Sequence, residues 1–122
     1  MKFNWRHLAF AFVGVTLLSA SLMAHHGAAS FDTSKELTLK GTVTEWLWAN
    51  PHCFLKMDAK DETGTVRNWT IELGNPTDIT PRGFSRRTFK VGDEVTALLQ
   101  PVKNGAPVGR LRTVTLADGS KL

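Results

Sequence analysis

The chain has 122 residues, with 15 lysine and arginine residues against 11 aspartate and glutamate residues and a formal net charge of +4. This length suits one small domain and excludes a multidomain enzyme. The single cysteine, Cys53, excludes an internal disulfide, so the fold must be held together by its hydrophobic core.

The first 24 residues have the layout of a secretory signal peptide. Lys2 and Arg6 form a positive start, Leu8 to Met23 is mostly apolar or small, and Ala24 offers a small residue at the cleavage site. The apolar run is shorter than the about 20 residues of a transmembrane helix, so we expect no stable membrane insertion after cleavage. Cleavage after Ala20 and an uncleaved anchor are the alternatives.

Cleavage after Ala24 changes the charge of the protein. Removing 24 of the 122 residues leaves 98, and the two charged residues that are lost are both basic. The mature chain then has 13 basic and 11 acidic residues, a net charge of +2. This charge is too small for a nucleic-acid-binding protein, so we expect no nucleic-acid partner.

Apolar and polar residues alternate along most of the chain after Lys35, which predicts β-strands. The first strand runs from Leu37 towards Trp48, and the second and third cover residues 53–58 and 66–73. A short helix is expected from about Pro76, because Asn75 can cap it and a proline suits the first helical position. Two further strands are expected at residues 95–99 and 109–116.

This order of elements predicts a mainly β fold, a small five-stranded, partly open barrel of the oligonucleotide/oligosaccharide-binding (OB) type. One short helix lies between its third and fourth strands. A small sandwich is the alternative, but a barrel leaves fewer exposed strand edges. We therefore expect a signal peptide at residues 1–24, an N-terminal arm at 25–35 and an OB-like barrel domain at 36–122.

The sequence also contains a spaced set of short motifs. In chain order they are His25-His26, Phe31-Asp32, Gly41-Thr42-Val43, Asn50-Pro51-His52, Trp69, Glu72-Leu73-Gly74, Arg82-Gly83-Phe84-Ser85-Arg86, Gly92-Asp93-Glu94-Val95 and Val114-Thr115-Leu116-Ala117-Asp118-Gly119. The set resembles a family of small exported bacterial proteins classified as a domain of unknown function (family 6152). The resemblance covers essentially the whole mature chain and implies a barrel-like domain in the periplasm of a Gram-negative bacterium. It implies no activity or catalytic residues.

Cleavage after Ala24 would place His25 and His26 at the new amino terminus, where they could bind a metal ion. The α-amino nitrogen and the imidazole of a first-position histidine can close a six-membered chelate ring. Reference pKa values of about 7.7–8.0 for the amine and about 6.5 for the imidazole make both available near neutral pH. Nitrogen ligands favour copper, with zinc as the alternative.

His52 is the third mature histidine and a candidate ligand of the same metal. By strand alternation it faces away from Cys53 and lies on the side of Phe54, so we expect it outside the core. The arm could reach it, because ten extended residues span about 30 Å. The alternative is that His25 and His26 are a solvated terminus and that His52 only caps a strand.

Two other groups of residues suggest a surface for a partner. Trp46, Trp48 and Phe54 could form an aromatic platform, although packing beneath the arm or the helix is the preferred interpretation. Arg82, Arg86 and Arg87 form a basic cluster near the helix. Such a cluster could bind an anionic group, but a solvated face is more common.

We therefore expect a periplasmic, non-enzymatic barrel protein that binds a transition metal, copper in preference to zinc. Its partner would be an unknown envelope protein or a metal donor or acceptor. The alternative is an envelope interaction module that binds a protein or a glycan through the aromatic and arginine face without a metal. A small copper oxidase is a further alternative, but no substrate pocket is evident from the sequence.

Overall fold

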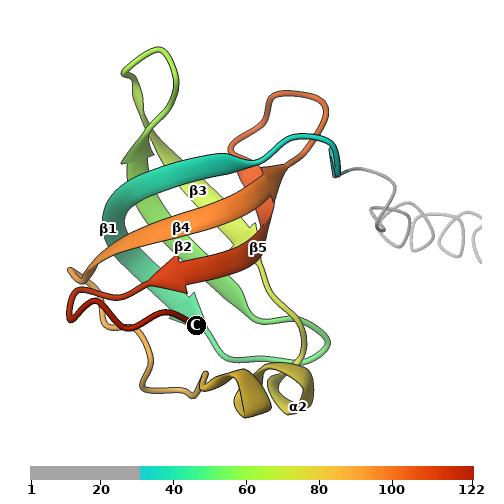
Figure 1. The fold of residues 1–122 in the computed structure, drawn as a ribbon, viewed down its shortest axis with the longest axis vertical. Coiled ribbons are helices and arrows are strands. Elements are labelled where there is room, and N and C mark those ends of the chain that lie inside the picture. Colours follow the sequence, from blue (N-terminus) through green and yellow to red (C-terminus); the bar gives the residue numbers. More distant parts are fainter. Residues whose placement is uncertain (1–30) are drawn as a thin grey trace, which may run out of the picture. The chain divides into compact units, whose positions relative to one another are not determined.

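The computed structural model describes residues 31–122, so the expected signal peptide and both His25 and His26 lie outside the described residues. The described part forms a five-stranded barrel with one short helical segment (Figure 1). Its elements are β1 (Leu37–Leu47), β2 (Phe54–Lys60), β3 (Val66–Glu72), α2 (Pro76–Ile79), the 3-10 turn η3 (Thr80–Arg82), β4 (Glu94–Pro101) and β5 (Val108–Thr115).

The strands close into a barrel in the order β1-β2-β3-β5-β4. All neighbouring pairs are antiparallel except β3 and β5, which are parallel and pair over Thr70 to Glu72. The prediction of a mainly β, OB-like barrel with a short helix between the third and fourth strands is confirmed. The barrel is closed rather than partly open, since the β3–β5 pair joins its two halves.

Strand β1 connects the two sides of the barrel. Residues 37–42 pair with β4, whereas residues 41–47 pair with β2, so the strand bends around Gly41. A Cβ atom at Gly41 would lie 2.2 Å from the carbonyl oxygen of Asp58, which no side chain tolerates. This close approach explains why the mid-strand position is a glycine.

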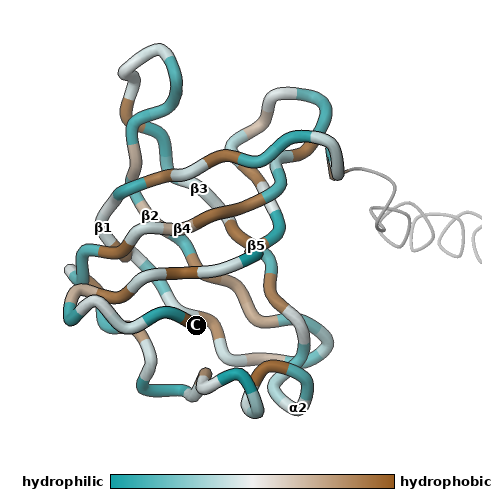
Figure 2. Tube along the Cα trace, in the orientation of Figure 1, coloured by the Kyte–Doolittle hydropathy of each residue, from teal (hydrophilic) through white to brown (hydrophobic). Residues whose placement is uncertain are grey.

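Side chains from alternate positions of each strand fill the barrel and form its core. Figure 2 shows this alternation as changes of hydropathy along the tube. Cys53 and Met57 are fully buried, so the thiol and the thioether belong to the core. The largest fully buried side chains are Phe84, Leu55, Met57, Ile71, Ile79, Leu99, Val43, Val114 and Cys53.

The short helix closes one end of the barrel (Figure 1). Asn75 caps it by accepting a hydrogen bond from the Asp78 amide at 3.0 Å, and Pro76 occupies the first turn. Gly83 ends η3 with a φ of 99°, a left-handed conformation that favours glycine. Ile79 and Phe84 join the core, so the segment plugs the barrel.

The opposite end of the barrel is surrounded by the β2–β3 hairpin and the β4–β5 loop (Figure 1). The chain before β1 lies at this end, where the Asp32 amide donates to the Pro101 carbonyl at 2.8 Å. Within residues 31–122 no helix is long and apolar enough to cross a membrane.

Candidate metal-binding residues and partner surface

His52 and Glu72 form a pair on the outer surface of the barrel. The Nδ1 atom of His52 contacts Oε1 of Glu72. The His52 side chain is 48% exposed and that of Glu72 is 18% exposed. The imidazole is therefore held by a carboxylate that is largely shielded from solvent, while much of the ring stays accessible.

The hairpin register explains why these two side chains lie together. Phe54 pairs with Glu72, and the backbone of Cys53 exchanges hydrogen bonds with Leu73 and Gly74. His52 lies two positions before Phe54 and therefore on the same outer face as Glu72. The expectation that His52 lies outside the core is confirmed, because the residue is exposed.

Glu72 was not identified from the sequence as a site residue, although two signals could have indicated it. Its neighbours Ile71 and Leu73 are apolar, so alternation places Glu72 on the outer face. A hairpin centred on Thr63 pairs position 72 with position 54, which brings position 72 close to His52.

A continuous row of side chains crosses the outer surface through this pair. Gln100 of β4, Arg110 of β5, Glu72 of β3 and Phe54 of β2 are successive partners in register. The first described residue, Phe31, packs on this row, because the Arg110 guanidinium lies 4.4 Å from the centre of its ring. The described part of the chain therefore begins beside β5, the strand that pairs with Glu72 of β3.

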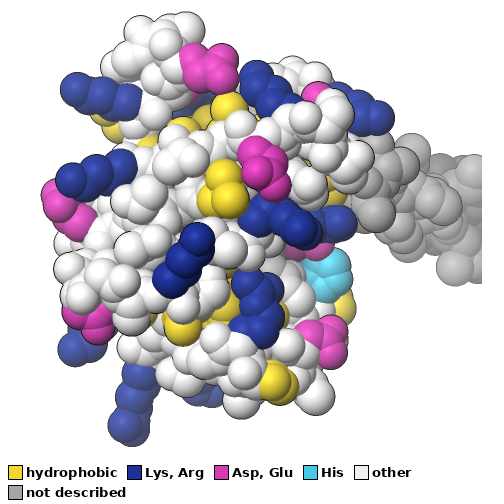
Figure 3. All heavy atoms as spheres, in the orientation of Figure 1, with side chains coloured by type: hydrophobic (Ala, Val, Ile, Leu, Met, Phe, Trp, Pro, Cys, Tyr) yellow, Lys and Arg dark blue, Asp and Glu magenta, His cyan; other side chains and the backbone are white. Residues whose placement is uncertain are grey.

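The polar character of this surface is mixed. Figure 3 shows a histidine side chain in cyan among acidic and basic side chains, and His52 is the only histidine of the described residues. Within residues 31–122 no group of three histidine, cysteine, aspartate or glutamate side chains is placed to hold a metal ion. His52 and Glu72 alone do not complete a site, and His25 and His26 lie outside the described part.

The three candidate aromatic residues do not form one platform. Trp46 and Trp48 pack against the core, with ring centres 5.8 Å apart, and Trp46 makes an edge contact with Phe89 at 4.9 Å. The Trp46 indole also donates to the Ser85 carbonyl at 3.0 Å. Phe54 lies on the outer face instead, beside its register partner Leu47. Trp46 and Trp48 are therefore packed against the protein and do not form a free platform.

The three arginines differ in their surroundings. Arg82 donates to the carbonyl of Arg112 at 3.0 Å and lies 5.3 Å from the ring centre of Phe84, so it is partly fixed. Arg86 and Arg87 are exposed, and neither forms an ion pair within the described part of the chain.

The closed barrel with its helix between β3 and β4 defines the protein as a small OB-like domain. A family model matches residues 13–111, and the chain belongs to that family, described as a family of unknown function (DUF6152). The predicted family resemblance is thereby confirmed. No match was found among curated proteins.

Two solved structures are similar in fold, and both are crystal structures of the mitochondrial single-stranded DNA-binding protein Rim1 of S. cerevisiae. The first has a TM-score of 0.50 and 10% sequence identity, covering 68% of this chain and 93% of Rim1. The second, with selenomethionine, has a TM-score of 0.45 and 16% identity, covering 67% and 92%. At this identity the first similarity shows the OB fold alone.

Proposed function

We propose that the mature protein is a periplasmic, non-enzymatic barrel protein that binds one transition-metal ion, copper in preference to zinc. The proposed ligands are His25 with its α-amino group, His26 and His52. The observation that supports this proposal most is the contact between His52 and Glu72, because it orients an exposed imidazole.

The contact determines which nitrogen of His52 is available. Nδ1 faces the Glu72 carboxylate, and a carboxylate beside one ring nitrogen favours the imidazole tautomer with its N–H on that nitrogen. The lone pair is then on Nε2. Histidine ligands of metal sites are commonly held by a carboxylate in this way, which fixes the ring and raises its basicity. The position of the Glu72 carboxylate supports His52 as a ligand through Nε2.

The length of the arm is sufficient for the proposed site. His26 precedes Phe31 by five residues, which span about 17 Å when extended. Phe31 packs on Arg110, and Arg110 pairs with Glu72 on the neighbouring strand, about 5 Å away in backbone spacing. The first residues of a chain cleaved after Ala24 would therefore be within reach of His52.

The donor set favours copper. An α-amine and three imidazoles are nitrogen ligands that suit the tetragonal geometry of Cu(II), and copper is highest in the affinity order of the divalent ions. Zinc would require three or four of the same ligands in a tetrahedral arrangement. The proposed role is carriage, buffering or delivery of the ion to a metal donor or acceptor protein of the envelope.

The same proposal includes a location in the periplasm and a function without a nucleic-acid partner. The signal-peptide pattern of residues 1–24 supports export to the periplasm. The mature net charge of +2 supports a function without nucleic acid, although the Rim1 structures share the fold.

A calorimetric titration of the mature protein with Cu(II) tests this proposal. The protein is purified from the periplasm and its first residue is confirmed by mass spectrometry. Three variants accompany it: a His25→Ala/His26→Ala double variant, His52→Ala, and a chain with three alanines added before His25. The added alanines keep all three imidazoles but move the free α-amine away from the first histidine, and they leave no histidine at the third position, where it would form a new Cu(II) chelate with the amino terminus.

We expect one equivalent of tightly bound Cu(II) in the wild type and loss of this tight step in each variant. The proposal is wrong if the wild type binds no tighter than an unstructured peptide of the same first residues. It is also wrong if the chain with the three added alanines binds as tightly as the wild type, because the chelating α-amine would then be irrelevant.

A second candidate function is an envelope interaction module that uses the arginine side of the barrel. The exposed side chains of Arg86 and Arg87, which form no ion pair within residues 31–122, favour it. Such a module would be insensitive to the three added alanines but would lose its protein or glycan partner in Arg86→Ala. A pull-down from a periplasmic extract, compared with Arg112→Ala as a control, distinguishes the two functions.

A further inference from the structure

A β-turn in the segment between η3 and β4 exposes two arginines (Figure 1). In this arginine turn, residues 85–88, the Thr88 amide donates to the Ser85 carbonyl at 3.2 Å, so Arg86 and Arg87 are the central residues. The Thr88 hydroxyl accepts a hydrogen bond from the Ser85 amide at 2.7 Å, and the Ser85 hydroxyl accepts one from the Arg87 amide at 3.1 Å. The turn therefore fixes the backbone that carries the two exposed guanidinium groups.

A second β-turn, the valine turn of residues 90–93, follows directly. The Asp93 amide donates to the Lys90 carbonyl at 3.0 Å, and the Lys90 amide donates to the Asp93 carboxylate at 2.9 Å. Val91 and Gly92 are its central residues, and the φ of 95° at Gly92 suits a type II turn. Val91 is 75% exposed, the largest value among the large hydrophobic residues of the described chain. A single exposed valine is common on protein surfaces, so its neighbours decide what it indicates.

Both turns are held against β1. The Trp46 indole donates to the Ser85 carbonyl at 3.0 Å, and Val43 exchanges two backbone hydrogen bonds of 2.8 Å with Gly92 and Asp93. Val43 and Trp46 are three positions apart on the strand, a distance of about 10 Å. The arginine turn and the valine turn therefore lie next to each other on a rigid support, so little conformational entropy is lost when both bind one partner.

The net charge of the described chain is concentrated in the segment that contains these turns. Residues 31–122 have 13 basic and 11 acidic residues, a net charge of +2. Residues 80–94 have four basic and two acidic residues, so the remaining residues have nine of each. The acidic ones, Asp93 and Glu94, come last, where the chain enters β4. No ion pair within residues 31–122 involves the four basic residues, which are Arg82, Arg86, Arg87 and Lys90.

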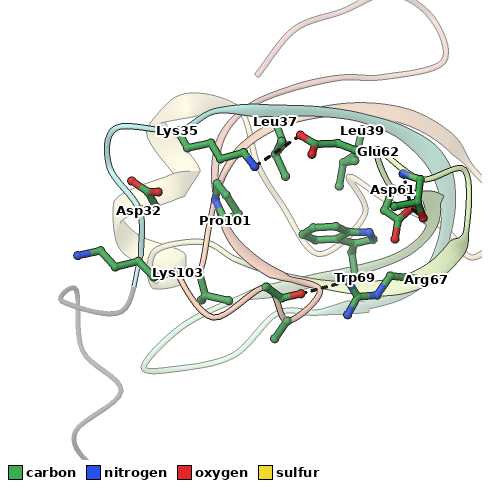
Figure 4. A pocket seen from close by; sticks show the side chains of 14 residues that line it. Asp32, Lys35, Leu37, Leu39, Asp61, Glu62, Arg67, Trp69, Pro101 and Lys103 are labelled. Carbon is green, nitrogen blue, oxygen red and sulfur yellow. Dashed lines mark hydrogen bonds and ion pairs between the residues drawn. The ribbon is translucent and has the colours of Figure 1, made fainter.

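The end of the barrel formed by the β2–β3 hairpin and the β4–β5 loop has balanced charges instead. Figure 4 shows a pocket there with three acidic and three basic residues at its rim: Asp32, Asp61, Glu62, Lys35, Arg67 and Lys103. Lys35 pairs with Glu62 at 3.5 Å. This end offers no net attraction to an anionic partner, so the charge distribution favours contact through the two turns.

We infer that the turn surface, formed by Arg86, Arg87, Lys90 and Val91, docks on an anionic phospholipid bilayer. The three cations contact headgroup phosphates, which guanidinium groups suit especially well, and Val91 enters the boundary with the acyl chains. Binding to such a surface increases with buried apolar area and with attraction to anionic lipids. With three cations and one valine it is weak and reversible.

This inference does not depend on the proposed metal site, so the mature protein can be tested without metal. It assigns a lipid surface, rather than a protein or a glycan, as the partner of the arginine side of the barrel. Co-sedimentation with vesicles measures the binding. Vesicles of phosphatidylglycerol and phosphatidylcholine in equal parts provide the anionic surface, and vesicles of phosphatidylcholine alone provide the neutral one.

Two variants of the turn surface are compared with the wild type. Arg86→Gln/Arg87→Gln should bind the mixed vesicles about 10–30-fold more weakly, because each cation near an anionic surface contributes about five-fold in affinity. Val91→Ser should bind about three- to ten-fold more weakly, because it loses the apolar contact. The wild type should bind neutral vesicles far more weakly than mixed ones, and high salt should release it from the mixed vesicles.

Matched control variants lie at the opposite end of the barrel. Lys60→Gln/Lys103→Gln removes the same number of charges, and neither lysine forms an ion pair in the described part of the chain. Val66→Ser removes another exposed valine, since Val66 is 59% exposed at the start of β3. Both control variants should bind the mixed vesicles as the wild type does.

A fluorescent label measures whether the valine turn enters the bilayer. Val91→Cys is labelled with nitrobenzoxadiazole, and the native thiol does not compete because Cys53 is fully buried. We expect the emission of this label to increase and shift to the blue on mixed vesicles. The same label on Val66→Cys should keep its emission in water.

Three results would overturn the inference. The first is a wild type that does not bind the mixed vesicles, even if an acidic protein or a glycan binds in Arg86-dependent fashion, because the surface would then serve the interaction module. The second is equal weakening in the turn variants and the control variants, which would indicate attraction without a docking surface. The third is an unchanged emission of the label at position 91, which would leave the valine turn in water.

Discussion

The imidazole of His52 is held by the carboxylate of Glu72 across the β2–β3 hairpin, on the outer surface of the barrel. The contact joins a residue just before β2 to the last residue of β3. Because Phe31 packs on the neighbouring strand, the start of the described chain and the oriented histidine lie on one side of the barrel. This relationship is the structural basis of the proposed metal site.

Glu72→Gln should weaken Cu(II) binding by about 10–100-fold, the usual effect of removing a carboxylate that orients a metal-binding histidine. Glutamine has nearly the same shape but no charge, so the fold should be retained. Competition with a chelator of known affinity measures the change. Glu94→Gln, at an exposed position of β4 without an ion pair in the described part, is the matched control. An unchanged affinity in Glu72→Gln would remove Glu72 from the site.

Phe31→Ala should weaken Cu(II) binding several-fold without changing the ligands. Phe31 is 4% exposed and is held by Arg110, so its loss frees the arm and lowers the effective concentration of the arm ligands near His52. The same competition assay measures the change. Leu116→Ala is the control, because it removes a half-buried contact with the core just after the end of β5. Equal Cu(II) affinities of the two variants would show that the arm needs no anchoring.

Gly41→Ala should destabilise the barrel by about 1–3 kcal/mol, the usual cost of overpacking. The added Cβ would lie 2.2 Å from the Asp58 carbonyl oxygen, so β1 and β2 would have to separate. Urea unfolding followed by circular dichroism gives the free energy of unfolding. Thr42→Ala, at the exposed neighbouring position, controls for strand propensity and should change this free energy little. A stable Gly41→Ala protein would contradict the close approach of the strands.

The stability of the protein should fall as the pH decreases below about 4, in part through Asp118. Hydrogen bonds from the Ser120 hydroxyl and amide lower the pKa of the Asp118 carboxyl. A group whose pKa is lowered by folding contributes stability above its unfolded pKa of about 3.9 and loses it as the pH falls through the folded value. Ser120→Ala should therefore reduce the change in urea midpoint between neutral and acidic pH. An identical pH dependence would show that this turn contributes nothing.

The strands and the helix could be predicted because their signals are local. Period-two alternation indicates each strand, and the Asn75–Pro76 cap and Gly83 indicate where the helical segment begins and ends. Gly41 could be identified for a related reason, since a glycine within an alternating strand indicates a close backbone contact.

The site was less accessible to sequence reasoning because its geometry is not local. The partner of His52 depends on the hairpin register, which brings Glu72 to it from the next strand. The tryptophans depend on a shift of register between Val43 and Glu45, which places Trp46 opposite the inward-facing Leu55 and against the core. Simple alternation does not include such a bulge.

Trp69 shows the same limit. Alternation correctly places it in the core, but it does not indicate that its indole N–H lacks an acceptor among the described residues.

Electron paramagnetic resonance of the mature protein with one equivalent of Cu(II) tests the central claim most directly. Hyperfine coupling to the ligand nitrogens reports which groups bind the ion. The account predicts a tetragonal, nitrogen-rich spectrum that loses one imidazole nitrogen in His52→Ala and changes again in His25→Ala/His26→Ala. A spectrum that is the same in wild type and His52→Ala, and the same as that of a free peptide of the first residues, would contradict a site built on the barrel.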